Sequence, residues 1–285
     1  MAVSTTTTLN DLLPQIVAEA LFVASERSIM RGLVRNYSIG AGQGKSVVVP
    51  IYPTSAAYSL TEGTDITANT ISTNGATLTV SEVGIMASVT DLSRVSSSSD
   101  VISDIGRVLG EAIARKMDQD LTSNFNLFTT NVLGNVTAAT TTITAADIFK
   151  ATAKLRSIGV PAGDLYCVLH PSIAYDLKAN LTATYSNPNA GVVQNEAMAM
   201  GYLGMLAGVP IYETSNVNNN GTTGDYNGGL FHRDALGLAM MQDIKLETQR
   251  DASLRADEIV ATAMYGHGVL YESYGVALGF DSSIL

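Results

Sequence analysis

The sequence is poor in charged residues, cysteine and tryptophan, and each shortage excludes a class of protein. Charged residues make up 15% of the 285 residues, against roughly 25% in an average soluble domain. Because an isolated soluble enzyme usually presents more Lys and Glu to solvent, we expect much of this surface to be covered by a partner. The lone Cys167 excludes an internal disulfide framework and a thiolate zinc site. No run of 18 apolar residues occurs, so we expect no membrane-spanning segment and no membrane partner.

The charge balance is acidic, with a formal net charge of −10. This balance argues against tight nucleic-acid binding over the whole surface, although a protein that lines a container for nucleic acid is compatible with it. Residues Met1–Asn10 carry no basic residue ahead of an apolar stretch, so we expect no secretory signal.

The first part of the chain predicts an arm. Met1–Thr8 is a Ser/Thr tail with nothing to bury, and we expect it to be disordered or ordered only by a partner. Leu9–Val34 has the apolar spacing of a helix. Arg27, Arg31 and Arg35 are four residues apart and would share one helical face. That face is either solvated or paired at an interface, or it is a basic stripe that meets a polyanion or an acidic neighbour.

The segment Lys45–Asp91 predicts an extended hairpin. Lys45–Tyr52 is a β-branched strand, and Ala76–Asp91 is a long strand whose alternation slips by one residue near Glu82–Val83, which indicates a bulge. Between the strands, Thr54–Gly75 is mainly Thr, Ser, Ala, Gly and Asn. An isolated hairpin with so few apolar residues is marginal in water, so we expect it to lie on another surface.

A long helix follows, and then a region where strands and helices alternate. From Val101 the apolar residues recur every three to four positions, which predicts a helix of about 28 residues. Thr144 and Asp147 predict a capping box for a helix over Ala145–Ser157. The further expected elements are a strand at Leu165–Leu169, a helix from Pro171 through Leu181, a short helix holding Met198–Leu206, a strand at Val209–Thr214, a mobile loop at Asn216–Gly229, strands at Leu238–Arg250, Glu258–Tyr265 and Val269–Phe280, and a turn or bulge at Gly266–Gly268.

Motifs of catalysis and ligand binding are missing from the sequence. Gly40–Ser46 resembles a phosphate loop, but its glycines are one residue too close and a strand follows, so we expect a flexible joint. His170, His232 and His267 lack ligand spacing and are expected at turns or caps. Cys167 is expected in the core, and the acidic pairs Asp257–Glu258 and Asp118/Asp120 on solvated faces. We therefore expect no catalytic, cofactor-binding or metal-binding residue, and no cofactor.

The order of these elements resembles one family. A helical arm, a long Thr-rich hairpin, a very long helix, a small α/β region and late strands are the layout of tailed-phage major capsid proteins with the Hong Kong 97-type fold, an α+β fold. Gly204–Tyr212 looks like that family's short helix leading into a strand of its axial domain. Gly229–Ala239 looks like the next strand and turn, and Asp251–Glu272 is similar to its closing strands.

The resemblance implies a division of the chain into the parts of that family. These are an N-terminal arm (1–44), an E-loop (45–93), the spine helix and peripheral domain (94–143), an axial domain (144–228) and the closing strands of the axial and peripheral domains (229–285).

The resemblance also implies a function. The chain would be a structural coat protein that assembles as hexamers and pentamers into an icosahedral shell around phage double-stranded DNA, without sequence-specific binding of that DNA. It would be found in the virion, after assembly as a procapsid in the cytoplasm of a bacterial host. The implied partners are other copies of itself, a portal and a cement or decoration protein.

Two departures from the family pattern and two rival hypotheses bear on this assignment. Ser46–Ser93 contains no Lys or Arg, so we expect no covalent cross-link from the hairpin to a neighbour. A long scaffolding segment ahead of the arm is not seen, so we expect a separate scaffolding protein.

The alternatives are an encapsulin-type compartment shell, which shares the fold, and, more remotely, a soluble α/β enzyme.

Overall fold

A computed structural model describes residues 28–40, 42–52, 57, 59, 62–63, 65, 73–91, 101–185, 204–219 and 224–284. Several predictions lie outside these residues: those for the tail Met1–Thr8, for most of the helix Leu9–Val34, for most of the segment Thr54–Gly75 and for the helix at Met198–Leu203. In the described residues, no helix combines the length and the apolar character needed to cross a membrane.

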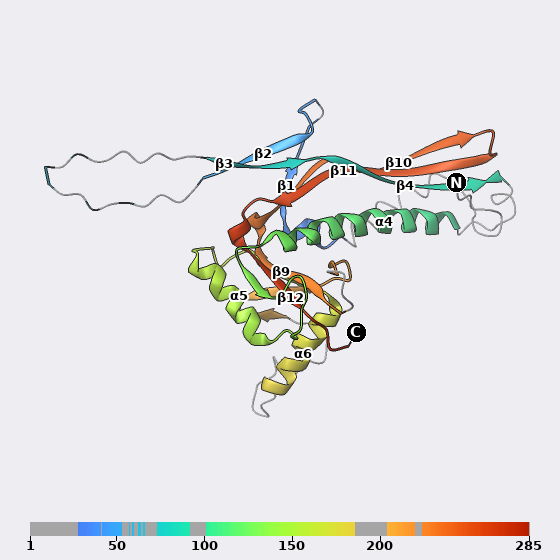
Figure 1. The fold of residues 1–285 in the computed structure, drawn as a ribbon. Coiled ribbons are helices and arrows are strands. Elements are labelled where there is room, and N and C mark those ends of the chain that lie inside the picture. Colours follow the sequence, from blue (N-terminus) through green and yellow to red (C-terminus); the bar gives the residue numbers. More distant parts are fainter. Residues whose placement is uncertain are drawn as a thin grey trace.

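The long helix lies along a four-stranded sheet. Helix α4 (Val101–Ser123) is followed by the 3-10 turn η1 (Asn124–Leu127). The sheet has the order β1-β10-β11-β4, with bounds β1 Arg35–Ser38, β10 Leu236–Asp251, β11 Ala256–Val269 and β4 Ser81–Thr90. In Figure 1 the helix runs beneath β4, β10 and β11 over most of their length.

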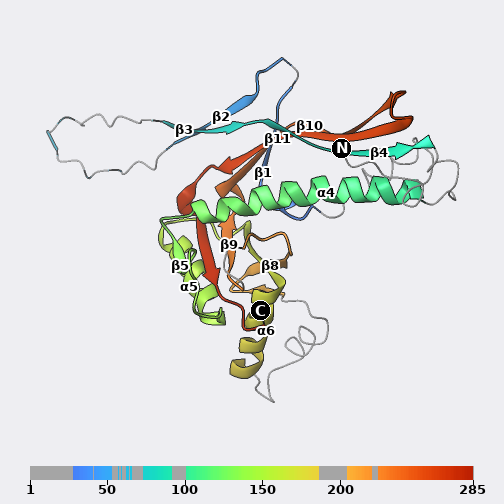
Figure 2. The same cartoon turned by 45° about the vertical axis from the view of Figure 1, so that its right-hand side comes forward.

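A second sheet lies on the other side of α4. Its order is β5-β12-β9-β6-β8-β7, with bounds β5 Val132–Gly134, β12 Gly275–Phe280, β9 Tyr226–His232, β6 Leu165–Leu169, β8 Val209–Glu213 and β7 Met205–Leu206. Helices α5 (Ala145–Ser157) and α6 (Pro171–Tyr185) pack beside it. Figure 2 shows this sheet and its helices below α4, away from the four-stranded sheet.

A two-stranded ribbon projects from the body. Strands β2 (Ser46–Ile51) and β3 (Asn74–Thr79) pair antiparallel with each other and form a sheet of their own. In Figure 1 the ribbon leaves the molecule at the end opposite to the turn that joins β10 and β11. The short elements α2 (Met30–Leu33), η2 (Arg233–Ala235) and η3 (Glu272–Tyr274) complete the described structure.

The apolar periodicity of the long helix is confirmed. The predicted inward positions are all 6% exposed or less: Ile105, Leu109, Ile113, Met117, Leu121, Phe125 and Phe128. They form one core with the inner faces of β4, β10 and β11. A second core lies between α5, α6 and the six-stranded sheet, and a third, small one lies at the root of the ribbon.

Some elements differ from their predicted form. The helix gives way to the 3-10 turn η1 at Asn124, whose side-chain amide donates to the carbonyls of Asp120 and Leu121 and so competes with the backbone N–H groups that would continue the α-helix. The predicted strand Ala76–Asp91 is two strands, β3 and β4, separated at Val80. The expected phase slip is present, because Ser81 and Glu82 are both exposed, but it marks a transfer of the chain from one sheet to another.

The prediction of a helix at Met205–Leu206 is wrong. These residues form β7, which turns through Ala207 (φ 56°) and Gly208 (φ 79°) into β8. Pairing of Met205 with Pro210 and of Leu206 with Val209 outweighs the helical propensity of the apolar run. The segment Gly204–Tyr212, which was expected to be a short helix followed by a strand, is therefore a β-hairpin.

Four further predictions are corrected. Tyr226–Gly229 is part of β9, not of a loop, and Gly266–Gly268 lies in β11 without a turn. The predicted strand Val269–Phe280 is interrupted by η3. Arg35 opens β1 after the extended residue Val34, so it does not share a helical face with Arg31.

Candidate functional site: surfaces for assembly

The ribbon has one covered and one open face. Val47 and Val49 of β2 pack against the small core at its root, which contains Ile39, Leu78 and Leu270. Side chains of the other face are exposed, and Val48 is 62% exposed. A two-stranded sheet with one apolar face is marginal by itself, so the open face is a candidate contact surface.

The ribbon is fixed to the body where it crosses β11. A Cβ added to Gly266 would lie 2.3 Å from the carbonyl oxygen of Thr79, so only glycine lets β3 approach this closely. The N–H of Val80 donates to the carbonyl of Lys45 at 2.8 Å and continues the β2–β3 pairing up to this point. The close approach at Gly266 thus joins the ribbon to the body where its pairing ends.

The root of the N-terminal arm is held by a buried carboxylate. Asp118 of α4 is 0% exposed and accepts hydrogen bonds from the Ser28 hydroxyl (3.1 Å) and from the N–H groups of Ile29 and Met30 (3.3 Å each). The Asn216 amide donates to its second oxygen at 3.5 Å. Burial raises the pKa of Asp118, and these hydrogen bonds act in the opposite direction.

Two ion pairs and a parallel strand hold the next part of the arm. Arg31 pairs with Asp243 at 3.1 Å and Arg35 with Asp234 at 2.8 Å. Strand β1 then pairs with the first residues of β10. The ion pairs are exposed and each contributes little, about 0–1 kcal/mol. Arg31 and Arg35 each pair with an aspartate of the same chain from different elements, so the prediction of one shared face is wrong for these two, while Arg27 lies outside the described residues.

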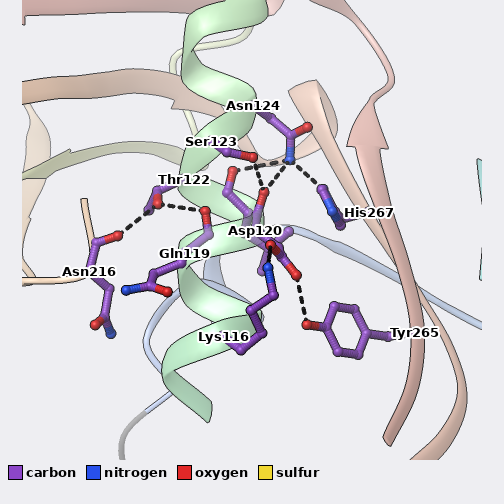
Figure 3. Close-up of polar contacts among 10 residues, drawn as sticks. Lys116, Gln119, Asp120, Thr122, Ser123, Asn124, Asn216, Tyr265 and His267 are labelled. Carbon is purple, nitrogen blue, oxygen red and sulfur yellow. Dashed lines mark hydrogen bonds and ion pairs between the residues drawn. The ribbon is translucent and has the colours of Figure 1, made fainter. Parts of the chain in front are cut away.

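The carboxyl end of α4 is joined to β11 by polar contacts, which Figure 3 shows. Asp120 accepts from the Lys116 ammonium at 2.6 Å and from the Tyr265 hydroxyl at 2.9 Å. Burial, and then the hydrogen bond to the Asp120 carboxylate, raises the pKa of Tyr265 above its usual range. The amide of Asn124 contacts Nδ1 of His267 at 3.0 Å, and burial lowers the pKa of His267.

The same end of the helix also contacts the loop after β8. The Thr122 hydroxyl donates to the carbonyl of Asn216 at 2.9 Å (Figure 3). Two aromatic rings extend this junction into the six-stranded sheet, because Phe125 packs on Gly229 of β9 and Phe128 on Gly275 of β12. The two sheets are thus fixed to each other through one helix end.

Residues that could carry chemistry are spread out and have structural contacts. His170 stacks on Tyr226 with ring centroids 3.6 Å apart, and His232 accepts the N–H of Asp234 at the start of η2. Cys167 is buried, and burial raises the pKa of its thiol. Within the ranges that the structure describes, no group of three or more His, Cys, Asp or Glu side chains could hold a metal ion.

Two further candidates give no binding site. Gly42 and Gly44 have positive φ and lead into β2, so this loop meets a strand instead of a helix N-terminus. A polar hollow of about 270 Å³ is lined by Arg35, Asn36, Asp164, His232, Arg233 and Asp234. Its two arginines and two aspartates offset each other in charge, so it favours neither anions nor cations.

Sequence reasoning found the ribbon and the helix but missed the polar junction. Asp118 and Asp120 were expected on solvated faces, whereas Asp118 is buried and Asp120 bonds Tyr265 across to β11. A signal was present: Asp118 lies four residues after Ala114 and three before Leu121, so at 100° per residue it shares a helical face with both.

Comparison of the sequence with known families gives a match over most of the chain. A family described as "Phage capsid protein" matches residues 55–278. A curated relative, the "Minor capsid protein" of Escherichia phage T7, is 40% identical over 58 residues, which is 20% of this chain and only 15% of that protein.

Solved structures share the fold over nearly the whole chain. The capsid structure of the cyanophage P-SCSP1u superposes with a TM-score of 0.70 at 22% identity, covering 90% of this chain and 89% of that one. Mycobacterium phage Che8 gives 0.69 at 21% identity over 88% and 90%. Gordonia phage Cozz gives 0.66 at 15% identity over 90% and 87%. The fold is therefore the Hong Kong 97-type α+β fold, and with the family match it identifies this chain as a member of the phage capsid protein family, a structural protein of the virion.

Proposed function

We propose that this chain is the major coat protein, which assembles as hexamers and pentamers into an icosahedral shell that encloses phage double-stranded DNA. The observation that carries the proposal is the ribbon β2–β3, which leaves the body with one face and one edge open. In a monomer this ribbon would stay exposed to solvent and be only marginally stable, whereas in a shell it can be buried against neighbouring subunits.

The division of the subunit into parts belongs to the same proposal. We assign the arm to 1–44, the E-loop to 45–93, the spine helix and peripheral domain to 94–143, the axial domain to 144–228 and the closing strands to 229–285. The hydrogen bond from Thr122 to Asn216 and the rings of Phe125 and Phe128 support a fixed relation between the proposed peripheral and axial domains. A fixed relation suits a subunit that repeats many times in one shell.

The partners of the shell also remain part of the proposal. They are a portal, a separate scaffolding protein, a possible cement protein and the enclosed DNA, with assembly in the cytoplasm of the bacterial host. The net charge of −10 supports enclosure without tight binding, because an acidic lining repels DNA phosphates and lets the DNA leave again.

Assembly of the purified chain tests the proposal. Sedimentation velocity and electron microscopy over a range of protein concentrations should show rings of five or six subunits and shells of irregular size, because uniform shells need the separate scaffolding protein. Shell formation should rise steeply above a threshold concentration, because each subunit makes several weak contacts. A single small species at every concentration, with the ribbon protected from protease, would contradict the proposal.

The contents of natural particles separate the proposal from a compartment shell. Particles that contain this chain should hold nuclease-protected double-stranded DNA. A protein cargo in place of DNA would favour the encapsulin-type alternative, which the family match does not favour.

A further inference from the structure

The sheet edges of this chain are protected unequally. The six-stranded sheet ends in β5, with three residues, and β7, with two, which are too short to template a partner strand. The four-stranded sheet ends in β1, with four residues and Arg35 at its start, and in β4, whose single charge is Glu82 near its start. Strand β2 has six residues, Ser46–Ile51, and none is charged.

The register of the ribbon shows which backbone groups of β2 face outward. Lys45 continues the pairing beside Ser46↔Thr79, and its carbonyl accepts the N–H of Val80 at 2.8 Å. In an antiparallel ladder, hydrogen-bonded pairs alternate with pairs whose groups point away. Residues Val47, Val49 and Ile51 therefore bond β3, whereas Ser46, Val48 and Pro50 direct their backbone groups to the outer edge.

The position of Pro50 agrees with this phase. Proline has no N–H, and within sheets it occurs where the missing donor would have faced away from the partner strand. The outer edge thus offers the N–H groups of Ser46 and Val48 and the carbonyls of Ser46, Val48 and Pro50. No hydrogen bond from either N–H to another residue is found in the part of the chain that the structure describes.

The two edges of the ribbon have different surroundings. Strand β3 meets the body through its own edge, since the Thr79 carbonyl, which belongs to an outward-facing pair, lies against Gly266 of β11. Strand β2 is on the far side of the ribbon from this contact. The side chain of Val48 is 62% exposed, so the open face is not covered there by the described residues.

We propose that the outer edge of β2 accepts an extended segment of a second copy of this chain by main-chain hydrogen bonding over Ser46–Val48. Pro50 ends the ladder, because it supplies no donor. The proposal rests on the proposed function, in which a second copy is present at every contact of the shell. An uncharged edge offers no side-chain charge to a partner, so recognition must come from the backbone and from apolar contact with Val48.

Hydrogen exchange of individual amides tests this pairing in the protein as it exists. In unassembled subunits, the amides of Val47 and Val49 should be protected by β3, and those of Ser46 and Val48 should exchange freely. In shells, Ser46 and Val48 should gain protection of about tenfold or more, as one new hydrogen bond in each gives. Shells in which these two amides still exchange as freely as in subunits would overturn the pairing while leaving the proposed function intact.

A proline substitution supplies the second test. Val48→Pro removes one outward N–H and leaves every β2–β3 hydrogen bond in place, whereas Val48→Thr keeps the N–H in a side chain of the same shape. We expect Val48→Pro to raise the threshold concentration for assembly about tenfold and Val48→Thr to change it little. Protection of Val47 and Val49 in unassembled Val48→Pro shows whether the ribbon is intact. Equal thresholds for the two variants with an intact ribbon would contradict the proposal.

Discussion

The ring of Phe128 lies directly on Gly275, so closely that a Cβ added to that glycine would be 2.3 Å from Cζ of the phenylalanine. Phe128 is 0% exposed and follows the end of α4, while Gly275 opens β12 in the six-stranded sheet. Neither the ring nor the backbone can move aside without disturbing a packed core. This contact, with that of Phe125 on Gly229, joins the long helix to the second sheet.

Gly275→Ala should therefore destabilise the protein by about 1–3 kcal/mol, the usual cost of overpacking a core. The measurement is denaturant unfolding of unassembled subunits. Gly163→Ala is the matched control, since a Cβ there has no neighbour within 4 Å and the residue has no positive φ. Equal stability of the two variants would show that the Phe128 contact is not tight.

Asp118→Asn should loosen the root of the arm. The substitution places an amide NH₂ against donors, because Ser28, Ile29 and Met30 all donate to the carboxylate. We expect a loss of about 1–2 kcal/mol and faster hydrogen exchange at Ile29 and Met30. Asp243→Asn makes the same chemical change at an exposed ion pair of the arm and should cost less than about 0.5 kcal/mol.

The difference in stability between the wild type and Asp118→Asn should depend on pH, and the pKa of Asp118 gives the sign. Burial raises the pKa of Asp118 in the folded state above its usual value of 3.8, so folding favours the protonated carboxyl. The stabilising effect of protonation is fully present below the unfolded pKa and is lost as pH rises through the folded pKa. The stability of the wild type relative to Asp118→Asn should therefore increase as the pH falls towards 4. A difference that shrinks over this range would be inconsistent with a raised pKa.

Glu272 holds the loop between η1 and β5 through hydrogen bonds, and its pKa is lowered, whereas that of Asp118 is raised. One of its carboxylate oxygens accepts from the N–H and hydroxyl groups of both Thr129 and Thr130, at 2.5–3.0 Å. The hydrogen bond from the Thr129 side chain is the main cause that lowers the pKa of Glu272 below its usual range. Glu272→Gln keeps the shape but weakens these charge-assisted bonds, and we expect a loss of about 1 kcal/mol at neutral pH.

Here stability is present above the usual carboxyl pKa and is lost as pH falls through the folded value. The difference between wild type and Glu272→Gln, measured by thermal unfolding, should therefore disappear in acid below pH 4.5. Glu258→Gln on β11 serves as the control for loss of one negative charge. A Glu272→Gln difference that persists unchanged in acid would exclude the lowered pKa as its cause.

The sequence predicted those elements whose signals are local. The capping box at Thr144 and Asp147 and the bounds of α5 agree with the structure residue for residue. The apolar stripe of α4 was likewise predicted, because seven positions repeat at helical spacing. Such features depend on neighbours in the chain and not on distant contacts.

The errors occur where a distant contact decides the local structure. Gly228 and Gly229 predict a turn by composition, yet they lie in β9, paired with β12. They are glycines because a Cβ there would meet the Val168 carbonyl or the ring of Phe125. Asp118 could not be assigned as buried without knowing that the arm returns to α4 with three donors. The sequence alone does not distinguish a glycine that leaves room for a neighbouring ring from a glycine that a turn requires.

The composition of the ribbon predicts how the shell resists denaturant. No Lys occurs between Ser46 and Ser93, so the ribbon has no amine for an isopeptide bond to a neighbour, and the contacts must be non-covalent. Mature shells boiled in detergent should therefore give a single band of one chain on a denaturing gel, without a ladder of multiples. They should also dissociate in guanidinium at a concentration that depends on the protein concentration, because dissociation of non-covalent contacts follows mass action. A ladder that survives boiling and reduction would mean that a covalent bond forms elsewhere on the subunit, and the shell would then not depend on the ribbon's apolar and backbone contacts alone.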